Sequence, residues 1–348
     1  MKVSIILPVR NEVGYIKKSL KSILNQKNIG KEFEILICDG MSTDGTREII
    51  KEYAQNINEI HIIDNPEKIV STGFNRALSK SKGRIIIRVD GHAKIASNFI
   101  GNSLEVINKI EADCVGGEIK HVAIGIIGQA VNFAQSSKFG VGGVVFREGS
   151  KEGKYVDTLA FGAYKRNVFE KLGGLDEELV RNQDDELNFR LIQNGGKIWL
   201  DPTIKSTYYP RNSLIKLFKQ YFQYGFYKIR LMQKRRGFAS WRHLVPGNFV
   251  LSLLIGFFLF IIKSDPFFLF LVGTTYLLFS LVFTLLEILK SPKHVFSIIL
   301  LPLTFFILHF SYGLGFLLGI LWFWNKWNDR KVKDHHFDKE QFKLNTNA

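Results

Sequence analysis

The N-terminal part of the chain, residues 1–204, alternates short apolar runs with longer amphipathic stretches. Four runs of strand length are rich in β-branched or other apolar side chains and cover residues 3–7, 34–38, 60–63 and 84–89. A stretch long enough for a helix separates each run from the next. This alternation is typical of helices that cover a mainly parallel β-sheet, so we predict an α/β domain over residues 1–204.

Three apolar runs follow at residues 244–262, 266–286 and 295–325, and none contains Lys, Arg, Asp or Glu. Each is long enough to cross the hydrocarbon core of a bilayer, which takes about 20 mostly apolar residues. Core helices of soluble proteins usually keep a polar stripe, so they are the weaker alternative. We therefore predict transmembrane segments over residues 244–325 and a polar C-terminal tail over residues 326–348.

The third apolar run is longer than one straight crossing of a core of about 30 Å requires. It also contains Pro302 and the pair Gly313 and Gly315. Two alternatives remain open. If the run doubles back as a short hairpin, the tail is cytosolic; if the run crosses once, the tail lies on the far side.

The net charge of +15 is concentrated in one segment. Residues 205–243 hold ten Lys and Arg and no Asp or Glu, so they contribute +10 of that total. Leu214, Leu217 and Tyr221 recur there at helical spacing, which indicates a basic amphipathic helix in the membrane interface. Because this charge borders the apolar runs, nucleic acid is disfavoured as a partner. Basic short loops remain cytosolic, so we predict an integral membrane protein with a cytosolic N-terminal domain.

Polar and acidic residues directly follow three of the predicted strands, at residues 8–12, 39–46 and 90–92. Ligands of parallel sheets bind beyond the carboxyl ends of the strands, so we expect these residues to form one site. Each cluster alone is also compatible with helix capping, but three at successive strand ends favour a site. With only two cysteines in the chain, a multi-cysteine zinc site is excluded. The carboxylate of Asp90 and the imidazole of His92 suit a divalent cation, manganese above all.

Four motifs, in this order, resemble family 2 glycosyltransferases of the GT-A fold. They are Pro8-Val9-Arg10-Asn11-Glu12, the run from Cys38 to Thr46, Val89-Asp90-Gly91-His92-Ala93, and the run from Gln183 to Leu191. The run at residues 88–93 and the membrane segments look closest to the succinoglycan-type exopolysaccharide enzymes. The resemblance covers about residues 1–230. It implies a Rossmann-like GT-A domain that transfers a sugar, with inversion, from a nucleotide diphosphate sugar, usually with Mg²⁺ or Mn²⁺.

Matched motif by motif, the resemblance also implies roles for single residues. Pro8, Arg10 and Glu12 would contact the nucleotide, and Asp39 would accept the ring N–H of a uracil base, which indicates a UDP-sugar donor. Asp90 would lie by the ribose and the metal. His92 stands where the family usually has a second Asp, so the metal stays open between Mn²⁺ and Mg²⁺.

Asp184 matches the Asp of the family's Glu-Asp motif. We predict it as the base that takes the proton of the acceptor hydroxyl, with Asp185 as the second choice. The alternative is that both acids only begin a helix and complement its dipole.

Processive members of the family carry Gln-x-x-Arg-Trp, whereas here Gln223 is followed by Phe226 and Tyr227. This difference favours the addition of single sugars to a lipid-linked or polysaccharide-precursor acceptor. A membrane-anchored nucleotide-binding pseudoenzyme, or a scaffold in a polysaccharide assembly complex, remains the alternative because His92 departs from the family's motif.

Overall fold

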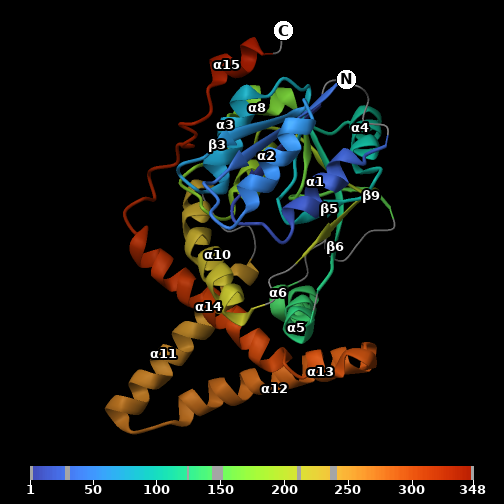
Figure 1. Ribbon diagram of the computed structural model, residues 1–348. Helices are drawn as coiled ribbons and strands as arrows, with labels where there is room; N and C mark the ends of the chain where they lie inside the picture. The colour runs from blue at the N-terminus through green and yellow to red at the C-terminus, as the bar shows by residue number, and fades with distance from the viewer. Residues whose placement is uncertain are drawn as a thin grey trace. The chain divides into compact units, whose positions relative to one another are not determined.

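The computed structural model describes residues 3–27, 32–123, 125–142, 152–209, 213–235 and 241–345. The chain divides into two compact units, whose helices and strands are drawn in Figure 1. The first unit consists of Met1–Lys120, Val145–Tyr208 and Val332–Ala348, and the second of His121–Val144 and Tyr209–Lys331. The C-terminal segment therefore folds with the N-terminal domain rather than with the helices that precede it in the chain.

The first unit is built on a nine-stranded sheet. β1 (Val3–Val9) lies between β2 (Phe33–Asp39) and β4 (Ile85–Arg88), β3 (Ile60–Asp64) pairs with β2, and all of these pairs are parallel. The order continues through β8 (Ala163–Lys165), β6 (Cys114–His121) and β9 (Ile198–Tyr208) to β5 (Ala93–Ile95), and β7 (Lys154–Tyr155) pairs with β9. The pairs β4–β8, β6–β8, β5–β9 and β7–β9 are antiparallel. The predicted α/β fold class is confirmed, and antiparallel strands extend its parallel half.

Two hydrophobic cores lie on the two faces of this sheet. One core contains side chains of α1 (Ile16–Leu24), α2 (Thr46–Asn56) and α4 (Phe99–Lys109). The other contains side chains of α3 (Val70–Lys80), α8 (Arg166–Leu172), α9 (Gln183–Gln193) and α15 (Lys339–Leu344). Successive side chains of a strand point to opposite faces, and accordingly Ile5 and Leu7 of β1 lie in the first core and Ile6 in the second. β1 is buried on both faces, which explains why all of its residues except Ser4 are apolar.

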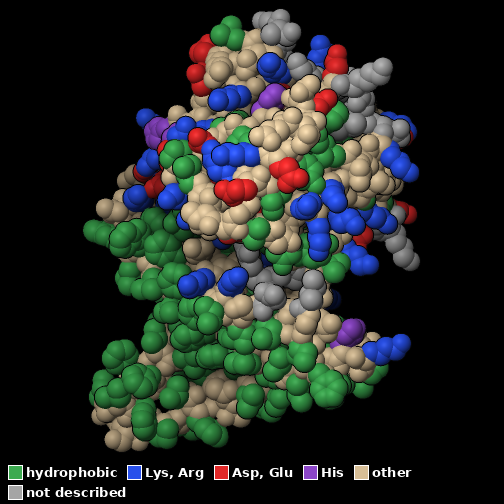
Figure 2. All heavy atoms as spheres, viewed as in Figure 1, with side chains coloured by type: hydrophobic (Ala, Val, Ile, Leu, Met, Phe, Trp, Pro, Cys, Tyr) green, Lys and Arg blue, Asp and Glu red, His purple; other side chains and the backbone are tan. Residues whose placement is uncertain are grey.

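The second unit is mainly helical in its described residues. Its helices are α5 (Gly125–Ser136), α6 (Lys138–Val141), α10 (Leu214–Arg235), η1 (Trp241–His243), α11 (Val245–Lys263), α12 (Phe267–Lys290), η2 (Pro292–His294), α13 (Val295–Ile298) and α14 (Leu301–Trp322). Three segments are long and apolar enough to cross a membrane: Trp241–Lys263, Phe267–Lys290 and Leu301–Trp322. Figure 2 shows hydrophobic side chains gathered over α11 and α12. These helices indicate membrane association.

The third apolar run forms the single turn of α13 and then the unbroken helix α14. Pro302 stands in the first turn of α14, where its missing N–H leaves no helical hydrogen bond unmade. Gly313 and Gly315 lie inside the helix without ending it. The run therefore does not double back as a hairpin, which removes one of the two alternatives that the sequence left open.

Candidate active site

Reciprocal hydrogen bonds tie together the loops that follow β1 and β2. The Asn11 N–H donates to Ser42 Oγ at 3.0 Å, and Asn11 Oδ1 accepts from the Thr43 N–H at 3.0 Å. The Glu12 N–H donates to Thr46 Oγ1 at 2.8 Å. Asn11 adopts a positive φ of 54°, a conformation that asparagine tolerates better than most residues. The polar residues after these two strands thus meet, as the strand pattern predicted.

Pro8 and Arg10 flank the end of β1. Pro8 pairs in register with Cys38, so it belongs to the buried ladder between β1 and β2. Arg10 is exposed, and its Cβ lies only 3.1 Å from where a Cβ at Gly40 would stand. A side chain at position 40 would therefore press on Arg10, which gives a packing reason for glycine next to Asp39.

The Asp39 carboxylate is fully buried and is held by protein donors. Ser42 Oγ donates to Asp39 Oδ1 at 2.6 Å, and Arg47 Nη1 donates to Asp39 Oδ2 at 2.8 Å. The same guanidinium donates to Asp64 Oδ1 at 2.5 Å. The Ser42 N–H also lies 3.3 Å from both carboxylate oxygens of Asp39. Asp39 is thus also the anchor of its own loop.

Glu12 and His92 lie together, although 80 positions separate them in the chain. His92 Nδ1 is 2.9 Å from Glu12 Oε1. The His92 ring meets the ring of Tyr208, at the end of β9, with centroids 4.9 Å apart. Glu12, predicted to contact the nucleotide, and His92, predicted to bind the metal, therefore share a hydrogen bond through Nδ1 of His92. The ring nitrogen of His92 that could bind a metal is then Nε2.

Arg88 links two of the predicted carboxylates, Asp90 and Asp184. Its Nε and Nη2 lie 3.2 and 3.1 Å from Asp90 Oδ1, and its Nη1 donates to Asp184 Oδ1. Burial raises the pKa of Asp90, but the charges of Arg88 and His92, together with the hydrogen bonds from Arg88, outweigh burial and hold that pKa below its usual value. Asp90 is therefore a carboxylate at neutral pH.

Sequence reasoning missed Arg88 as a site residue. A signal was present, because Arg88 is the only charged residue of β4. A cation at the end of a strand this apolar needs an anionic partner, but only the fold identifies Asp184 as one.

The three acids at the start of α9 have different partners. Asp184 pairs with Arg88, Asp185 Oδ1 accepts from Thr158 Oγ1 at 3.2 Å, and Glu186 forms an ion pair with Arg190 at 2.7 Å. All three stand in the first turn, where negative charge complements the helix dipole. Asp184 and Asp90 are therefore held close together by their shared contact with Arg88. Asp185, in contrast, has one carboxylate oxygen bound to Thr158.

A divalent cation fits this site only with help from its substrate. Among the described residues, no group of three or more His, Cys, Asp or Glu is arranged to hold a metal ion. Asp90 Oδ1 is already engaged by Arg88, and His92 Nδ1 by Glu12. Asp90 Oδ2 and His92 Nε2 therefore provide at most two protein ligands. Sites of this kind, with one or two protein ligands and the remainder from phosphate oxygens and water, are usual for cations bound with nucleotides.

Comparison with known proteins identifies the class. Residues 4–173 match Glycosyl transferase family 2. The chain is 32% identical over 247 residues to the succinoglycan biosynthesis protein ExoA of Rhizobium meliloti, covering 70% of this chain and 73% of that protein. It therefore belongs to this family, as its motifs predicted, and it is a glycosyltransferase.

Two further comparisons extend beyond the catalytic domain. A dolichyl N-acetyl-alpha-D-glucosaminyl phosphate 3-beta-D-2,3-diacetamido-2,3-dideoxy-beta-D-glucuronosyltransferase of Methanococcus voltae is 29% identical over 331 residues, which cover 92% of this chain and 97% of that enzyme. Among solved structures, a mannosyltransferase of Pyrobaculum calidifontis, in complex with GDP-Man and Mn²⁺, superposes with a TM-score of 0.56 at 16% identity. That superposition covers 92% of this chain and 87% of the mannosyltransferase. It supports the fold class.

Proposed function

We propose that this protein is an inverting, non-processive glycosyltransferase that moves one sugar from a UDP-sugar to a lipid-linked or polysaccharide-precursor acceptor at the cytosolic membrane face. One observation carries the proposal. Arg88 contacts both Asp90 and Asp184, although 96 positions separate Arg88 from Asp184. A donor-side carboxylate and a base candidate are thus held at one strand end, as a displacement reaction requires.

On the donor side, Pro8, Arg10 and Glu12 would border the nucleotide, and Asp39 would accept a base N–H. Asp90 and His92 are the residues that would hold Mn²⁺ or Mg²⁺. When bound there, the cation would neutralise negative charge on the leaving diphosphate. The mannosyltransferase with the same fold was solved with a nucleotide sugar and Mn²⁺, which supports this assignment.

On the acceptor side, Asp184 would remove the hydroxyl proton. More than a third of its side-chain surface is exposed, so an acceptor hydroxyl has access to it. The positive charge of Arg88 keeps its carboxylate close to Asp90 without a direct contact between two anions. Asp185, with one oxygen on Thr158, is the second choice for this role.

A membrane-bound acceptor agrees with two features of the chain. The apolar helices bring the enzyme to the bilayer, and the Methanococcus voltae relative, aligned over 97% of its length, is named for a dolichyl phosphate-linked acceptor. The segment from Gln223 to Tyr227 lacks the Arg and Trp of processive members, which supports transfer of one sugar. The basic segment at residues 205–243 supports a cytosolic catalytic domain by the positive-inside tendency.

The decisive experiment uses the full chain in lipid nanodiscs with a panel of UDP- and GDP-sugars and lipid extract as the acceptor source. We expect release of UDP that depends on the acceptor, together with a lipid product heavier by one sugar in mass spectrometry. Turnover with GDP-sugars alone would contradict the UDP assignment. Binding of UDP without any transfer would instead support the nucleotide-binding scaffold.

A further inference from the structure

We propose that the chain enters and leaves the bilayer on the same side. In this arrangement α11 and α12 cross as a hairpin, and α14 lies in the interfacial layer although it is long enough to span. The inference does not depend on which sugar or acceptor the enzyme uses. It rests on the C-terminal segment and on the partners of α14.

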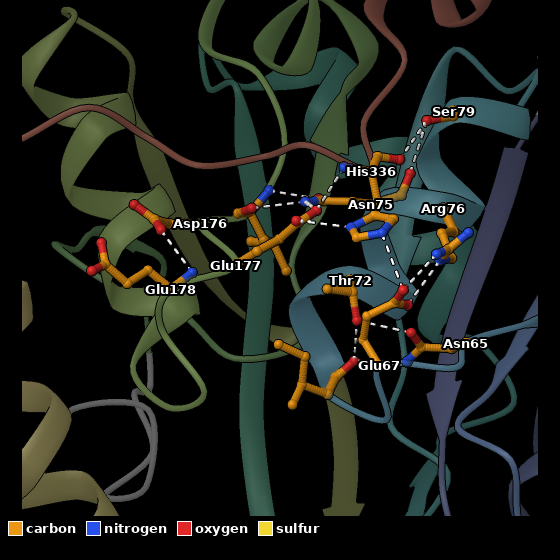
Figure 3. A network of polar contacts seen from close by, with 12 residues as sticks. Asn65, Glu67, Thr72, Asn75, Arg76, Ser79, Asp176, Glu177, Glu178 and His336 are labelled. Atoms are coloured by element: carbon orange, nitrogen blue, oxygen red, sulfur yellow. Dashed lines mark hydrogen bonds and ion pairs between the residues drawn. The ribbon is translucent and has the colours of Figure 1, made fainter.

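Hydrogen bonds hold the C-terminal segment in the first unit. His336 Nδ1 lies 2.9 Å from Glu177 Oε2 and its Nε2 lies 3.2 Å from Glu67 Oε1, as Figure 3 shows. The Asp338 N–H donates to Ser79 Oγ at 2.8 Å. The segment also accepts hydrogen bonds from two main-chain N–H groups of the first unit. The carbonyl of Lys333 accepts from the Glu177 N–H at 2.7 Å, and Asp334 Oδ2 accepts from the Gly174 N–H at 2.9 Å.

Buried aromatic side chains complete the attachment. Phe342 is fully buried and Phe337 nearly so, and both belong to the second core of the sheet. The guanidinium of Arg166 stacks over the Phe342 ring, 3.6 Å from its centroid, and donates to the Phe342 carbonyl. The segment is thus part of the fold of the catalytic domain. The described residues of the first unit, from β1 to β9 and from residue 332 to 345, must then lie on one side of the membrane. The chain between β9 and the C-terminal segment therefore crosses an even number of times.

The first half of α14 packs on α5 and α6, which lie in the chain between β6 and β7 of the first unit. His309 Nε2 lies 3.0 and 3.1 Å from the carbonyl oxygens of Phe139 and Gly140 in α6. Phe305 of α14 shares a core with Val131 and Ala134 of α5. α5 begins four residues after the end of β6, and among the described residues every candidate span begins at or after Trp241. This half of α14 therefore stays on the catalytic side.

The second half of α14 packs on α10, and the two backbones touch through glycines. A Cβ at Gly225 of α10 would lie 2.0 Å from the carbonyl oxygen of Tyr312, and a Cβ at Gly315 of α14 would lie 2.1 Å from that of Phe222. The middle of α14 thus lies against the middle of α10. α10 carries Lys216, Lys219, Lys228, Arg230, Lys234 and Arg235. Placing so many cations at the centre of a bilayer costs too much free energy, so α10 does not span the membrane. Because α14 packs along α10, α14 does not span it either.

α11 and α12 have the opposite character. In the most apolar stretch of each segment, only 17% of α11 and 11% of α12 is buried inside the protein, compared with 44% of α14. α11 ends at Lys263 and has no other charged residue. From there to Lys290, at the end of α12, the only charged residues are Asp265 in the connecting turn and Glu287, which pairs with Lys290. The exposed tryptophans of this unit gather at the start of α11 and the end of α14: Trp241, Trp322, Trp324 and Trp327. Tryptophan favours the membrane interface, which puts both ends at that level.

Sidedness is tested with the full chain in sealed vesicles and a membrane-impermeant maleimide. Single cysteines are introduced by Ser264→Cys, in the turn between α11 and α12, and by Gln341→Cys, exposed on α15. Both native thiols are buried, and burial raises the pKa of Cys38 to about 12, so they give little background. We expect Gln341→Cys to label on the same side as an N-terminal tag and Ser264→Cys on the opposite side.

Labelling of Gln341→Cys on the side opposite to the N-terminal tag would overturn the proposal, because α14 would then cross. Labelling of Ser264→Cys on the same side as the tag would overturn the crossing hairpin. Depth measurement separates the helices independently. A spin label at Leu318→Cys on α14 should report headgroup-level depth, whereas one at Leu278→Cys, near the middle of α12, should lie at the bilayer centre. Equal depth at the two sites would also refute an interfacial α14.

Discussion

Arg88 is the central residue of the candidate site, because it contacts two carboxylates from distant parts of the chain. Asp90 follows β4 by two positions, and Asp184 begins α9. Without a cation between them, two anions at one strand end would repel and one would tend to take up a proton. Arg88 lies between the two carboxylates and offsets this repulsion.

The first prediction concerns the base. Asp184→Asn keeps size and polarity, so we expect UDP affinity and thermal stability to persist while sugar transfer falls by about 10² or more, as for loss of a positioned base. Asp185→Asn is the matched control in the same helical turn. Steady-state transfer rates, melts and UDP titrations on the same samples measure this. A silent Asp184→Asn with an inactive Asp185→Asn would move the base by one residue.

The second prediction concerns the nucleobase. Asp39→Ala would leave Arg47 without its buried partner, so Asp39→Asn is the cleaner change. A lost hydrogen bond to a charged group is worth about 1.5–3 kcal/mol, and we expect UDP binding to weaken about 10-fold or more. Asp64→Asn is the control, since it removes the other partner of Arg47 and leaves Asp39 unchanged. Calorimetry with equal UDP affinity in both variants would contradict the assignment of Asp39.

The third prediction concerns the cation. If Asp90 and His92 hold it together with the donor diphosphate, transfer stops in excess chelator and returns with Mn²⁺ at least as well as with Mg²⁺. His92→Ala should raise the Mn²⁺ concentration needed for half-maximal activity, because one of two protein ligands is lost. Lys94→Ala, at an exposed position two residues on, should leave it unchanged. Full activity in chelator would dismiss a metal requirement.

At the scale of elements, the most consequential feature is α15 and the segment before it. A short helix of six residues has little stability alone, and its Phe342 instead completes a core formed by α3, α8 and α9. The C-terminal segment is therefore a structural part of the catalytic domain. Its attachment also restricts how many times the helices between the two parts can cross a membrane.

The fourth prediction tests this attachment. Phe342→Ala removes a fully buried ring, and we expect the free energy of unfolding of the first unit to fall by about 3–5 kcal/mol. Leu344→Ala changes an exposed side chain of the same helix and should have little effect. Amide exchange of β1 and β2 in the full chain, across a urea series, reports the difference. Equal protection in both variants would show that the segment contributes no stability.

At the scale of the whole molecule, the chain combines a soluble-type catalytic unit with a helical unit suited to a bilayer. The predicted boundaries between the N-terminal domain, the basic segment, the transmembrane segments and the tail, at residues 204, 243 and 325, stay a prediction. The enzyme's orientation in the cell is likewise a prediction, based on the ten basic residues of segment 205–243.

The fifth prediction is therefore the absolute orientation. A phosphatase that is active only outside the cytosol should be inactive when fused to the N-terminus and active when inserted at Ser264. The reason is that short loops with many Lys and Arg remain in the cytosol. An active N-terminal fusion would contradict a cytosolic supply of the donor sugar and, with it, the proposed function.

Local sequence determined much of this protein. The apolar periodicity predicted the first four strands, and the four motifs predicted the family, because both signals lie within a few neighbouring residues. Three uncharged runs likewise predicted three helices suited to a membrane. Such features follow from side-chain alternation and from the cost of placing charge among apolar groups.

Only the tertiary structure decided which distant residues meet. Arg88 reaches Asp184 across 96 positions, and Arg166 reaches Phe342 across 176. Hydrophobic periodicity predicts whether a residue is buried, but it does not predict which distant residue it contacts. That contact depends on the strand order and on where the C-terminal segment folds back. For the same reason the pattern predicted α14 as a possible span, whereas its contacts with α5, α6 and α10 carry the inference that it does not cross.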